Sequence, residues 1–330
     1  MIHSFLQRMS NFTKRHDYYN EGAGDMITLR DNEKAFDRFK IRPRILSDVS
    51  SVDTSTTILG EKVSLPIGFS PAAMHGLAHP DGEKATSRAA STLNIPMGLS
   101  TYSTVLLEDV IVERQQGQKN PYAFQLSVVK DRDVTLQWIK RAENCGYKAI
   151  FMTVDAPVLG NRLGERRNKF ELPPHLSLPN LPADRGRSHH YSGRDASSSW
   201  DTTIPWIKAN TNLEIWLKGI YCPDDVLKAI HYGLDGVIIS NHGGRQLDGV
   251  PATIDALAEC APVAKGRIKI AIDSGIRRGA DIFRALALGA DFCFIGRIPI
   301  WGLAYDGQNG VELAVKILEE ELRTTMALAG

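Results

Sequence analysis

The sequence predicts an α/β fold in the form of a (β/α)8 TIM barrel, and three observations support this prediction. Eight short runs rich in Ile, Val and Phe recur along the chain, with helical patterns between most of them. Strands that alternate with helices pair in parallel through right-handed crossovers, and eight strands can close into a barrel. The length of 330 residues allows either two ordinary domains or one large barrel, and eight such units fit the barrel. An open, doubly wound sheet is the competing architecture.

The chain before the first apolar run, residues 1–64, does not follow this alternation. We predict that it forms an N-terminal helical cap followed by a short hairpin. We therefore expect a single domain over residues 1–330, in which the cap precedes the barrel. The eight strand runs begin near Leu65, Ile95, Tyr122, Ala149, Leu213, Asp235, Ile268 and Phe292.

The helices between the runs carry start and stop signals. Over Asp131–Cys145, apolar residues recur every three or four positions, as on one face of a helix, and Gly146 follows as a stop. A second helix is predicted from Pro223, which fits the first helical position, to a stop at Gly233. A third is predicted over Ala280–Leu288.

A long segment, residues 157–212, separates the fourth and fifth strand runs. Its 56 residues are rich in proline and include a polar run from Asp184 to Ser199. A connection of this length leaves the carboxyl end of a barrel, where active sites lie, and is either a functional lid or a passive insertion. We predict a lid insertion whose middle is mobile, and both readings of its role stay open.

Composition argues against several classes of protein. Lys and Arg number 39 and Asp and Glu 38, a net charge of +1, so neither nucleic-acid coating nor membrane-surface binding is indicated. No run of 18 apolar residues could span a bilayer. The four cysteines form no C-x-x-C pair and the nine histidines show no ligand spacing, so we expect no metal. With no secretory pattern at the N-terminus, we expect an intracellular, cytoplasmic protein.

Glycines and arginines follow the seventh and eighth strand runs. Gly275 and Arg277 lie in the segment that starts at Asp273, and Gly296 and Arg297 end the last run. Barrels often bind phosphate with these two loops, where glycine lets the backbone approach an anion and arginine grips phosphate oxygens bidentately. The sequence therefore favours a phosphate site here. Two surface arginines beside turn glycines are the alternative.

His242 and Arg245 follow the sixth strand run, at the catalytic rim of the predicted barrel. Histidine is the side chain best suited to moving a proton near neutral pH, and arginine can bind a carboxylate by a fork. A base beside a carboxylate clamp is what proton removal next to a carboxylate requires. This pair favours catalysis over a structural histidine.

The motifs S-N-H-G-G-R-Q-L-D-G (residues 240–249), D-S-G-I-R-R-G (273–279) and I-G-R (295–297) together carry a resemblance. The sequence resembles the FMN-dependent 2-hydroxy acid oxidases and dehydrogenases over nearly its whole length. This resemblance implies FMN as cofactor, a small carboxylate as substrate, and O2 or another electron acceptor. It also implies a homo-oligomer, a tetramer in many relatives. Some eukaryotic relatives are peroxisomal, although the C-terminus here shows no such signal.

The resemblance also implies roles for the residues around the reaction centre. His242 would take a proton from the substrate, and Asp155 would stabilise its charged imidazole. Arg245 and Tyr18 would hold the substrate carboxylate, with Arg162 as a second cation. Lys218 would lie beside the flavin and stabilise its reduced, anionic form.

A larger set of residues would hold the cofactor by the same resemblance. The flavin would contact Ser70, Pro71, Ala72, Ala73, Ser100, Gln125, Thr153, Lys218 and Ser240, and the ribityl phosphate would contact Asp273, Gly275, Arg277, Gly296 and Arg297.

Two substrate positions depart from the family pattern. The family usually has a tyrosine after Gln-Leu on the third strand, and here Ser127 follows Gln125 and Leu126. Tyr102 stands where several members carry Trp or another bulky group. Because the missing ring opens space and removes a hydroxyl donor, a larger substrate becomes plausible.

We therefore expect an FMN-dependent oxidoreductase that converts an L-2-hydroxy acid to the 2-keto acid, with O2 as acceptor and H2O2 as product. The alternative within the same chemistry is a larger or cyclic α-substituted carboxylate from a biosynthetic pathway. A different class, a non-catalytic barrel that binds FMN or phosphate, is the third reading. His242, Arg245, Asp155 and Lys218 together argue against that last reading.

Overall fold

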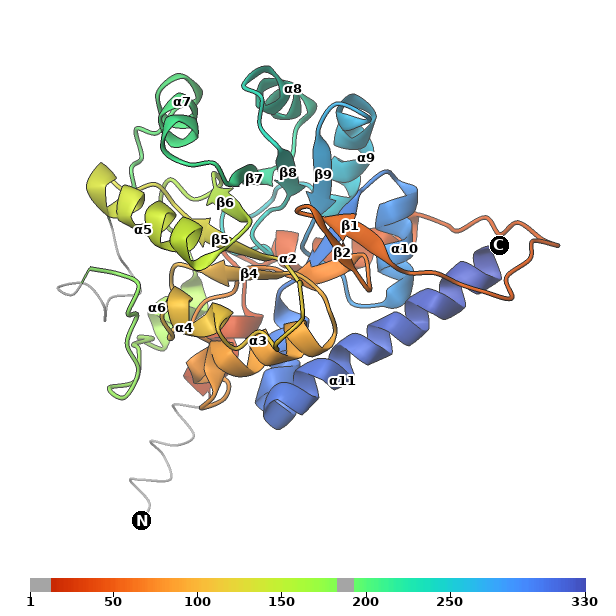
Figure 1. Cartoon of the computed structure of the whole chain (residues 1–330), viewed down its shortest axis with the longest axis horizontal. Coiled ribbons are helices and arrows are strands. Elements are labelled where there is room, and N and C mark those ends of the chain that lie inside the picture. Colours follow the sequence, from red (N-terminus) through yellow and green to blue (C-terminus); the bar gives the residue numbers. More distant parts are fainter. Residues whose placement is uncertain (1–12, 183–192) are drawn as a thin grey trace, which may run out of the picture.

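The computed structural model describes residues 13–182 and 193–330, and its centre is a closed parallel barrel (Figure 1). The strands follow the order β10-β3-β4-β5-β6-β7-β8-β9 around the barrel. This closure confirms the predicted (β/α)8 fold and excludes the open sheet. The strands are β3 Ile67–Phe69, β4 Met97–Ser100, β5 Tyr122–Leu126, β6 Ala149–Thr153, β7 Glu214–Ile220, β8 Gly236–Ile239, β9 Lys269–Ile272 and β10 Phe292–Ile295.

Each barrel strand is followed by a helix, and the helices surround the barrel in Figure 1. The predicted signals lie at their ends: the Asp131 carboxylate accepts from the first-turn N–H groups of α5, and Gly146 ends that helix at φ 85°. The helices are α3 Gly82–Thr92, α4 Leu107–Ile111, α5 Arg132–Cys145, α7 Trp200–Asn210, α8 Pro223–His231, α9 Thr253–Ala264, α10 Gly279–Ala287 and α11 Arg297–Ala329.

Aromatic side chains fill the amino-terminal end of the barrel. Phe294 packs against Phe151 and Phe292, with ring centroids 5.3 and 5.2 Å apart. The indole of Trp216 occupies the space where a Cβ at Gly236 would lie, so that position needs glycine. Since this end is closed by packing, a ligand site is left to the carboxyl ends of the strands.

The N-terminal segment contributes to both ends of the barrel. The hairpin of β1 Thr56–Ile58 and β2 Glu61–Val63 adds apolar side chains to the cluster at the amino-terminal end. At the carboxyl end, α2 Ile27–Lys34 is fixed by Asp248, whose carboxylate accepts from the backbone N–H of Ile27 at 3.3 Å and Thr28 at 2.9 Å. The expected helical cap and hairpin are therefore present, but they lie at opposite ends of the barrel.

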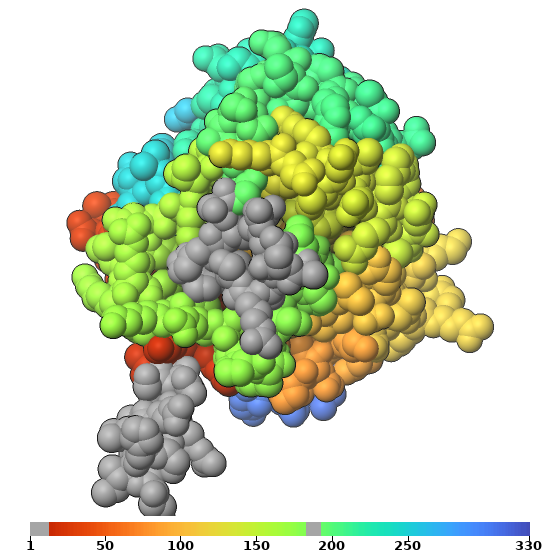
Figure 2. Space-filling view, turned by 90° about the vertical axis from the view of Figure 1, so that its left-hand side faces the viewer, coloured from red at the N-terminus to blue at the C-terminus, as the bar shows by residue number. Residues whose placement is uncertain are grey.

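The insertion between β6 and β7 contains two helices, α6 Leu163–Arg167 and α7. Because α7 takes the place of the barrel helix after β6, the segment without a barrel counterpart is residues 157–199. Figure 2 shows its light-green residues on one face, between the red N-terminal segment and the yellow residues of α5. The predicted mobile middle falls largely on residues 183–192, outside the described residues. In the described part of the chain, no helix is long and apolar enough to cross a membrane.

Candidate active site

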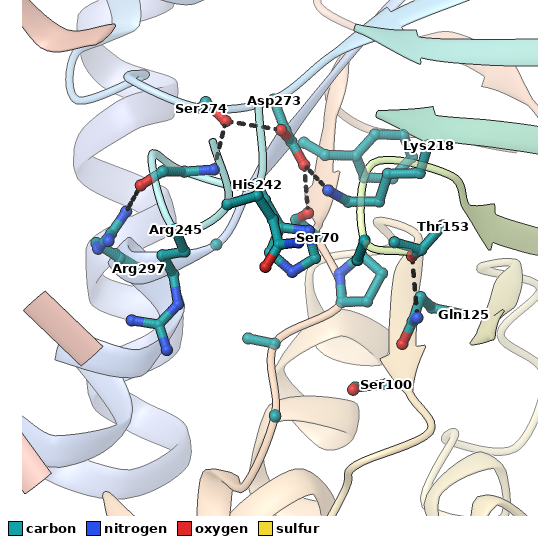
Figure 3. Close-up of a pocket in the computed structure, with 18 of the residues that line it drawn as sticks. Ser70, Ser100, Gln125, Thr153, Lys218, His242, Arg245, Asp273, Ser274 and Arg297 are labelled. Carbon is teal, nitrogen blue, oxygen red and sulfur yellow. Dashed lines mark hydrogen bonds and ion pairs between the residues drawn. The ribbon is translucent and has the colours of Figure 1, made fainter. Parts of the chain in front are cut away.

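A cavity opens at the carboxyl end of the barrel, and nearly all the predicted site residues line it (Figure 3). Asp155 and Ser240 are the exceptions, and both contact residues that do line it, His242 and Lys218. The predicted residues that line the cavity are Tyr18, Ser70, Pro71, Ala72, Ala73, Ser100, Tyr102, Gln125, Ser127, Thr153, Arg162, Lys218, His242, Arg245, Asp273, Gly275, Arg277, Gly296 and Arg297.

A buried ion pair joins β7 to the loop after β9. Lys218 Nζ lies 2.8 Å from Asp273 Oδ2 and 2.8 Å from Ser240 Oγ. Ser70 and Ser274 also donate to the Asp273 carboxylate, at 2.8 and 2.9 Å (Figure 3). Burial opposes ionisation of Asp273, but Lys218 and the hydroxyls of Ser240 and Ser70 outweigh it, so the pKa of Asp273 lies below its ordinary value. We name Lys218, Asp273, Ser70, Ser240 and Ser274 the Lys218 cluster.

A second pair joins β8 to β6. His242 Nδ1 lies 3.1 Å from Asp155 Oδ1, and the Asp155 side chain is only 5% exposed. Because an ionised carboxylate can only accept, Nδ1 carries the proton and Nε2 is the free acceptor. Burial lowers the pKa of His242 below 6.5, while Asp155 opposes that shift. His242 is therefore a neutral base at pH 7, held in a left-handed conformation at φ 60° that is rare outside glycine.

Two arginines share one buried carboxylate. Arg245 Nη2 lies 3.0 Å from Glu165 Oε1, and Arg162 Nη1 lies 3.3 Å from the same oxygen. Because the two guanidinium groups share a single carboxylate oxygen, they keep N–H donors that could bind a substrate carboxylate. We name His242, Asp155, Arg245, Arg162 and Glu165 the His242 cluster.

Tyr18 brings the N-terminal segment into this cluster. Its ring lies under the Arg245 guanidinium, 5.0 Å from ring centroid to Cζ, and its backbone oxygen accepts from Arg245. Burial raises the pKa of Tyr18 in spite of the neighbouring cations, so its hydroxyl stays protonated and can donate.

The arginines of the predicted phosphate loops differ in their contacts. Arg297 donates to three backbone oxygens, those of Tyr19, Gly243 and Glu21, at 2.7–3.2 Å. Burial and three neighbouring arginines lower the pKa of Arg297 to about 9, and a bound anion would raise it again. Arg277 lines the cavity but points its Nη2 to Glu33, at 2.7 Å.

Backbone shape and polar side chains complete the cavity wall. At Gly275, φ is 82° and a Cβ would lie 2.0 Å from the Asn32 oxygen, so only glycine fits beneath α2. On the opposite side, Gln125 Nε2 donates to Thr153 Oγ1 at 3.0 Å (Figure 3). Ser127, just beyond this pair, is half-buried and lines the cavity.

Several residues of the site were not predicted. Glu165 lies inside the lid insertion and could have been noticed only as an acid three residues after Arg162. Tyr19 and Arg194 line the cavity, and Arg194 stacks over the Tyr102 ring at 5.6 Å. Gln246 ties the insertion to the loop after β8 through Gly160 N, at 3.0 Å. Apart from the spacing of Arg162 and Glu165, no local sequence signal marks these contacts, because the others join segments far apart in the chain.

Comparison with known proteins agrees with this geometry. The family model described as FMN-dependent dehydrogenase matches residues 7–330. "Oxidase FUB9" of Fusarium oxysporum f. sp. lycopersici is 53% identical over 321 residues, 95% of this chain and 83% of that protein. "2-Hydroxyacid oxidase 1" of Homo sapiens is 44% identical over 329 residues, 96% of this chain and 88% of that protein.

Solved structures give the same result. A mandelate oxidase variant with (S)-mandelic acid superposes with a TM-score of 0.88 at 34% identity, covering 99% of this chain and 93% of the other. A variant with the C4a-OH-FMN adduct superposes with a TM-score of 0.87 at 35% identity, covering 96% and 91%. The family model matches nearly the full length of the chain, and the barrel and its cavity agree with that match. This chain therefore belongs to the FMN-dependent dehydrogenase family.

Proposed function

We propose that the protein oxidises an L-2-hydroxy acid to the 2-keto acid with FMN, and that dioxygen is reduced to H2O2. The observation that carries the proposal is a single cavity with three features in its wall. These are a neutral histidine base, two arginines that share one carboxylate, and a buried lysine. The relatives named 2-hydroxyacid oxidase and glycolate oxidase support the substrate class.

The cavity wall fits FMN. The Ser70–Ala73 backbone, Ser100 and the Gln125–Thr153 pair offer a polar edge for the flavin ring. Asp273 and Gly275 would face the ribityl chain, and Arg297, with its depressed pKa, would face the phosphate together with Arg277. The chemistry that FMN supplies when bound is the acceptance of two electrons from the substrate and their transfer to dioxygen.

His242 would accept the proton in this reaction. With Nδ1–H held by Asp155 at 3.1 Å, Nε2 is the ring nitrogen left to accept, and since His242 lines the cavity it would take the proton of the substrate. The carboxylate of Asp155 then stabilises the imidazolium, since opposite charges lie in contact in a buried site. This arrangement lets a base of low intrinsic pKa become cationic only while the substrate is bound.

The substrate carboxylate would be held by Arg245, Arg162 and the Tyr18 hydroxyl. The two arginines already share Glu165, so an incoming carboxylate would bind their remaining N–H donors. Lys218 lies on the far side of the cavity and supplies positive charge where electron density accumulates during oxidation. The arginines would therefore bind the substrate carboxylate, and Lys218 would face the flavin.

A larger or cyclic α-substituted carboxylate is the second candidate substrate. Ser127, where the family usually has tyrosine, supports it, as does the 53% identity to an oxidase named FUB9. A barrel that only binds FMN is disfavoured, because the cavity holds more than a cofactor site requires. A histidine base is paired with Asp155, and Arg245 and Lys218 add buried positive charge.

The proposal is tested by purifying the protein, recording its visible spectrum and adding candidate L-2-hydroxy acids without oxygen. Bleaching of the flavin by a hydroxy acid, followed by recovery of its colour and formation of H2O2 when oxygen is admitted, would support the oxidase. A yellow protein that no hydroxy acid bleaches would overturn the substrate assignment. Bleaching without reoxidation by oxygen would assign a different electron acceptor.

We also propose that the chain forms a homo-oligomer. Large apolar side chains are exposed on two segments. Leu46 lies on the segment after α2, and Tyr305 and Ile317 lie on α11. Such a surface is typical of subunit contacts. The molar mass in solution, measured by light scattering, tests this, and a monomer at micromolar concentration would exclude it.

A further inference from the structure

A second cavity of about 380 Å3 adjoins the first. It lies between the carboxyl ends of β6 and β7, the start of α8 and the inner face of α7. The space is many times that of one water in the liquid, about 30 Å3. The residues that line both cavities, and so form the boundary between them, are Ser127, Thr153, Ala156 and Arg194.

The wall of the second cavity is mainly apolar. Val154, Leu217 and Ile204 contribute aliphatic surface from β6, β7 and α7. Three acids line this cavity and each already has a basic partner: Asp155 has His242 at 3.1 Å, Asp195 has Arg132 at 2.7 Å and Asp225 has Lys228 at 3.3 Å. The arginine of the lining, Arg194, stacks over the Tyr102 ring. An uncharged apolar group therefore fits this space better than a second carboxylate does.

Ser127 is one of the four residues at the boundary between the two cavities. Its side chain is the smallest polar one available at the boundary and is only half-buried. A tyrosine at this position would place a ring in the space that both cavities share. The first cavity alone holds the groups that act on the hydroxyl and the carboxylate, so a bulky α-substituent needs room beyond that boundary.

We propose that the second cavity binds the α-substituent of the substrate and that Ser127 gives access to it. The substrate class is then a 2-hydroxy acid with an uncharged apolar substituent of several carbons. This inference rests on the proposed oxidation of 2-hydroxy acids. The carboxylate and hydroxyl stay with Arg245 and His242, while the chain passes Ser127 towards Ile204.

The test compares L-2-hydroxyoctanoate with L-lactate by anaerobic flavin reduction. Each methylene group removed from water contributes about fourfold in affinity. We therefore expect kcat/KM of the wild type to be at least tenfold higher for L-2-hydroxyoctanoate than for L-lactate. Ser127→Tyr, which closes the boundary, and Ile204→Trp, which fills the cavity, should each lower that ratio at least tenfold.

Matched controls separate this effect from general damage. Ser127→Ala removes the hydroxyl and keeps the opening, and Ala209→Trp adds the same ring to the exposed side of α7. Both controls should keep the wild-type ratio. Binding of the unreactive 2-oxooctanoate and pyruvate, followed by the change in flavin absorbance, gives a second readout that needs no turnover.

The inference is overturned if the wild-type ratio is below twofold, or if both Ser127→Tyr and Ile204→Trp leave it unchanged. Tight binding of 2-oxooctanoate that is lost in these variants would support it even if no acid reduced the flavin, and that result would overturn the proposed reaction alone. If L-lactate and L-2-hydroxyoctanoate reduced the flavin equally well, the proposed function would stand, but the second cavity would have no part in substrate binding.

Discussion

The Lys218 cluster and the His242 cluster lie at the same end of the barrel but differ in how completely their hydrogen bonds are made. In the Lys218 cluster, both carboxylate oxygens of Asp273 accept hydrogen bonds, and the lysine and aspartate side chains are only 5% and 6% exposed. In the His242 cluster, Asp155 Oδ2 and Glu165 Oε2 are buried and have no hydrogen-bond partner among the described residues.

The placement of the charges also differs. Lys218 and Asp273 pair directly with each other, whereas Arg245 and Arg162 share the Glu165 carboxylate and the Asp155 carboxylate faces a histidine that is neutral at rest. A network in which every polar atom is hydrogen-bonded is rigid and suits a permanently bound group. Unpaired polar atoms leave hydrogen-bonding capacity for a ligand that binds and dissociates. This difference supports the proposal that the Lys218 cluster faces the resident cofactor and that the His242 cluster faces the substrate.

Replacing His242 by alanine should give the largest effect. Loss of the only neutral base in the His242 cluster is expected to slow flavin reduction by the substrate about 10⁴-fold. Stopped-flow absorbance under anaerobic conditions measures this rate. FMN content should stay near that of the wild type, because the Lys218 cluster is intact. A loss of bound FMN with an unchanged rate per flavin would show that the two clusters are not separable.

Lys218→Met should damage the other cluster. Removing one partner of a buried pair leaves Asp273 charged and uncompensated, which costs about 3–5 kcal/mol of unfolding free energy. Denaturant unfolding of the apoprotein measures this cost. The double variant Lys218→Met/Asp273→Asn should recover most of the loss, since no unpaired charge remains. If the double variant is as unstable as the single one, the ion pair is not the cause.

Glu165→Gln should change anion binding more than stability. Removing the carboxylate that Arg245 and Arg162 share frees their charge, so the affinity for a substrate-like anion such as oxalate should rise about tenfold. Flavin reduction should become slower, because the arginines lose their anchor. Titration of the flavin absorbance with oxalate measures the affinity, and Glu171→Gln, an exposed acid at the C-terminal side of α6, is the matched control. Weaker oxalate binding would contradict this account.

The smallest effect concerns pH. Since the base must be neutral and burial lowers the pKa of His242, kcat/KM should decline on the acid side with an apparent pKa below 6.5. Asp155 opposes that shift, so Asp155→Asn should move the acid limb to still lower pH. The pH profile of kcat/KM measures both. A limb that moves to higher pH in this variant would show that another group controls it.

Local sequence features predicted much of the site for a physical reason. In a parallel barrel the carboxyl ends of all strands meet at one face, so a residue such as Lys218 or His242 that ends a strand run is brought to that face. Hydrophobic periodicity and glycine stops located the strand ends, and with them His242, Arg245 and the glycine–arginine loops. The other residues of the cavity wall, such as Gln125 and Thr153, were named from the resemblance. The roles given to these residues came from a resemblance between motifs, and they stay predictions until the variants above are measured.

The sequence by itself determined the barrel, its strand ends and the family, because strand and helix periods, caps and short motifs are encoded by neighbouring residues. Only the tertiary structure decided that Glu165 joins two arginines and that a second cavity adjoins Ser127. It also gave the distance of 3.1 Å between His242 and Asp155, a pair that the resemblance had implied. Those contacts link β6, its insertion and the loop after β8, and they depend on how side chains pack once the barrel has closed. Packing between distant segments has no short-range signature in the chain.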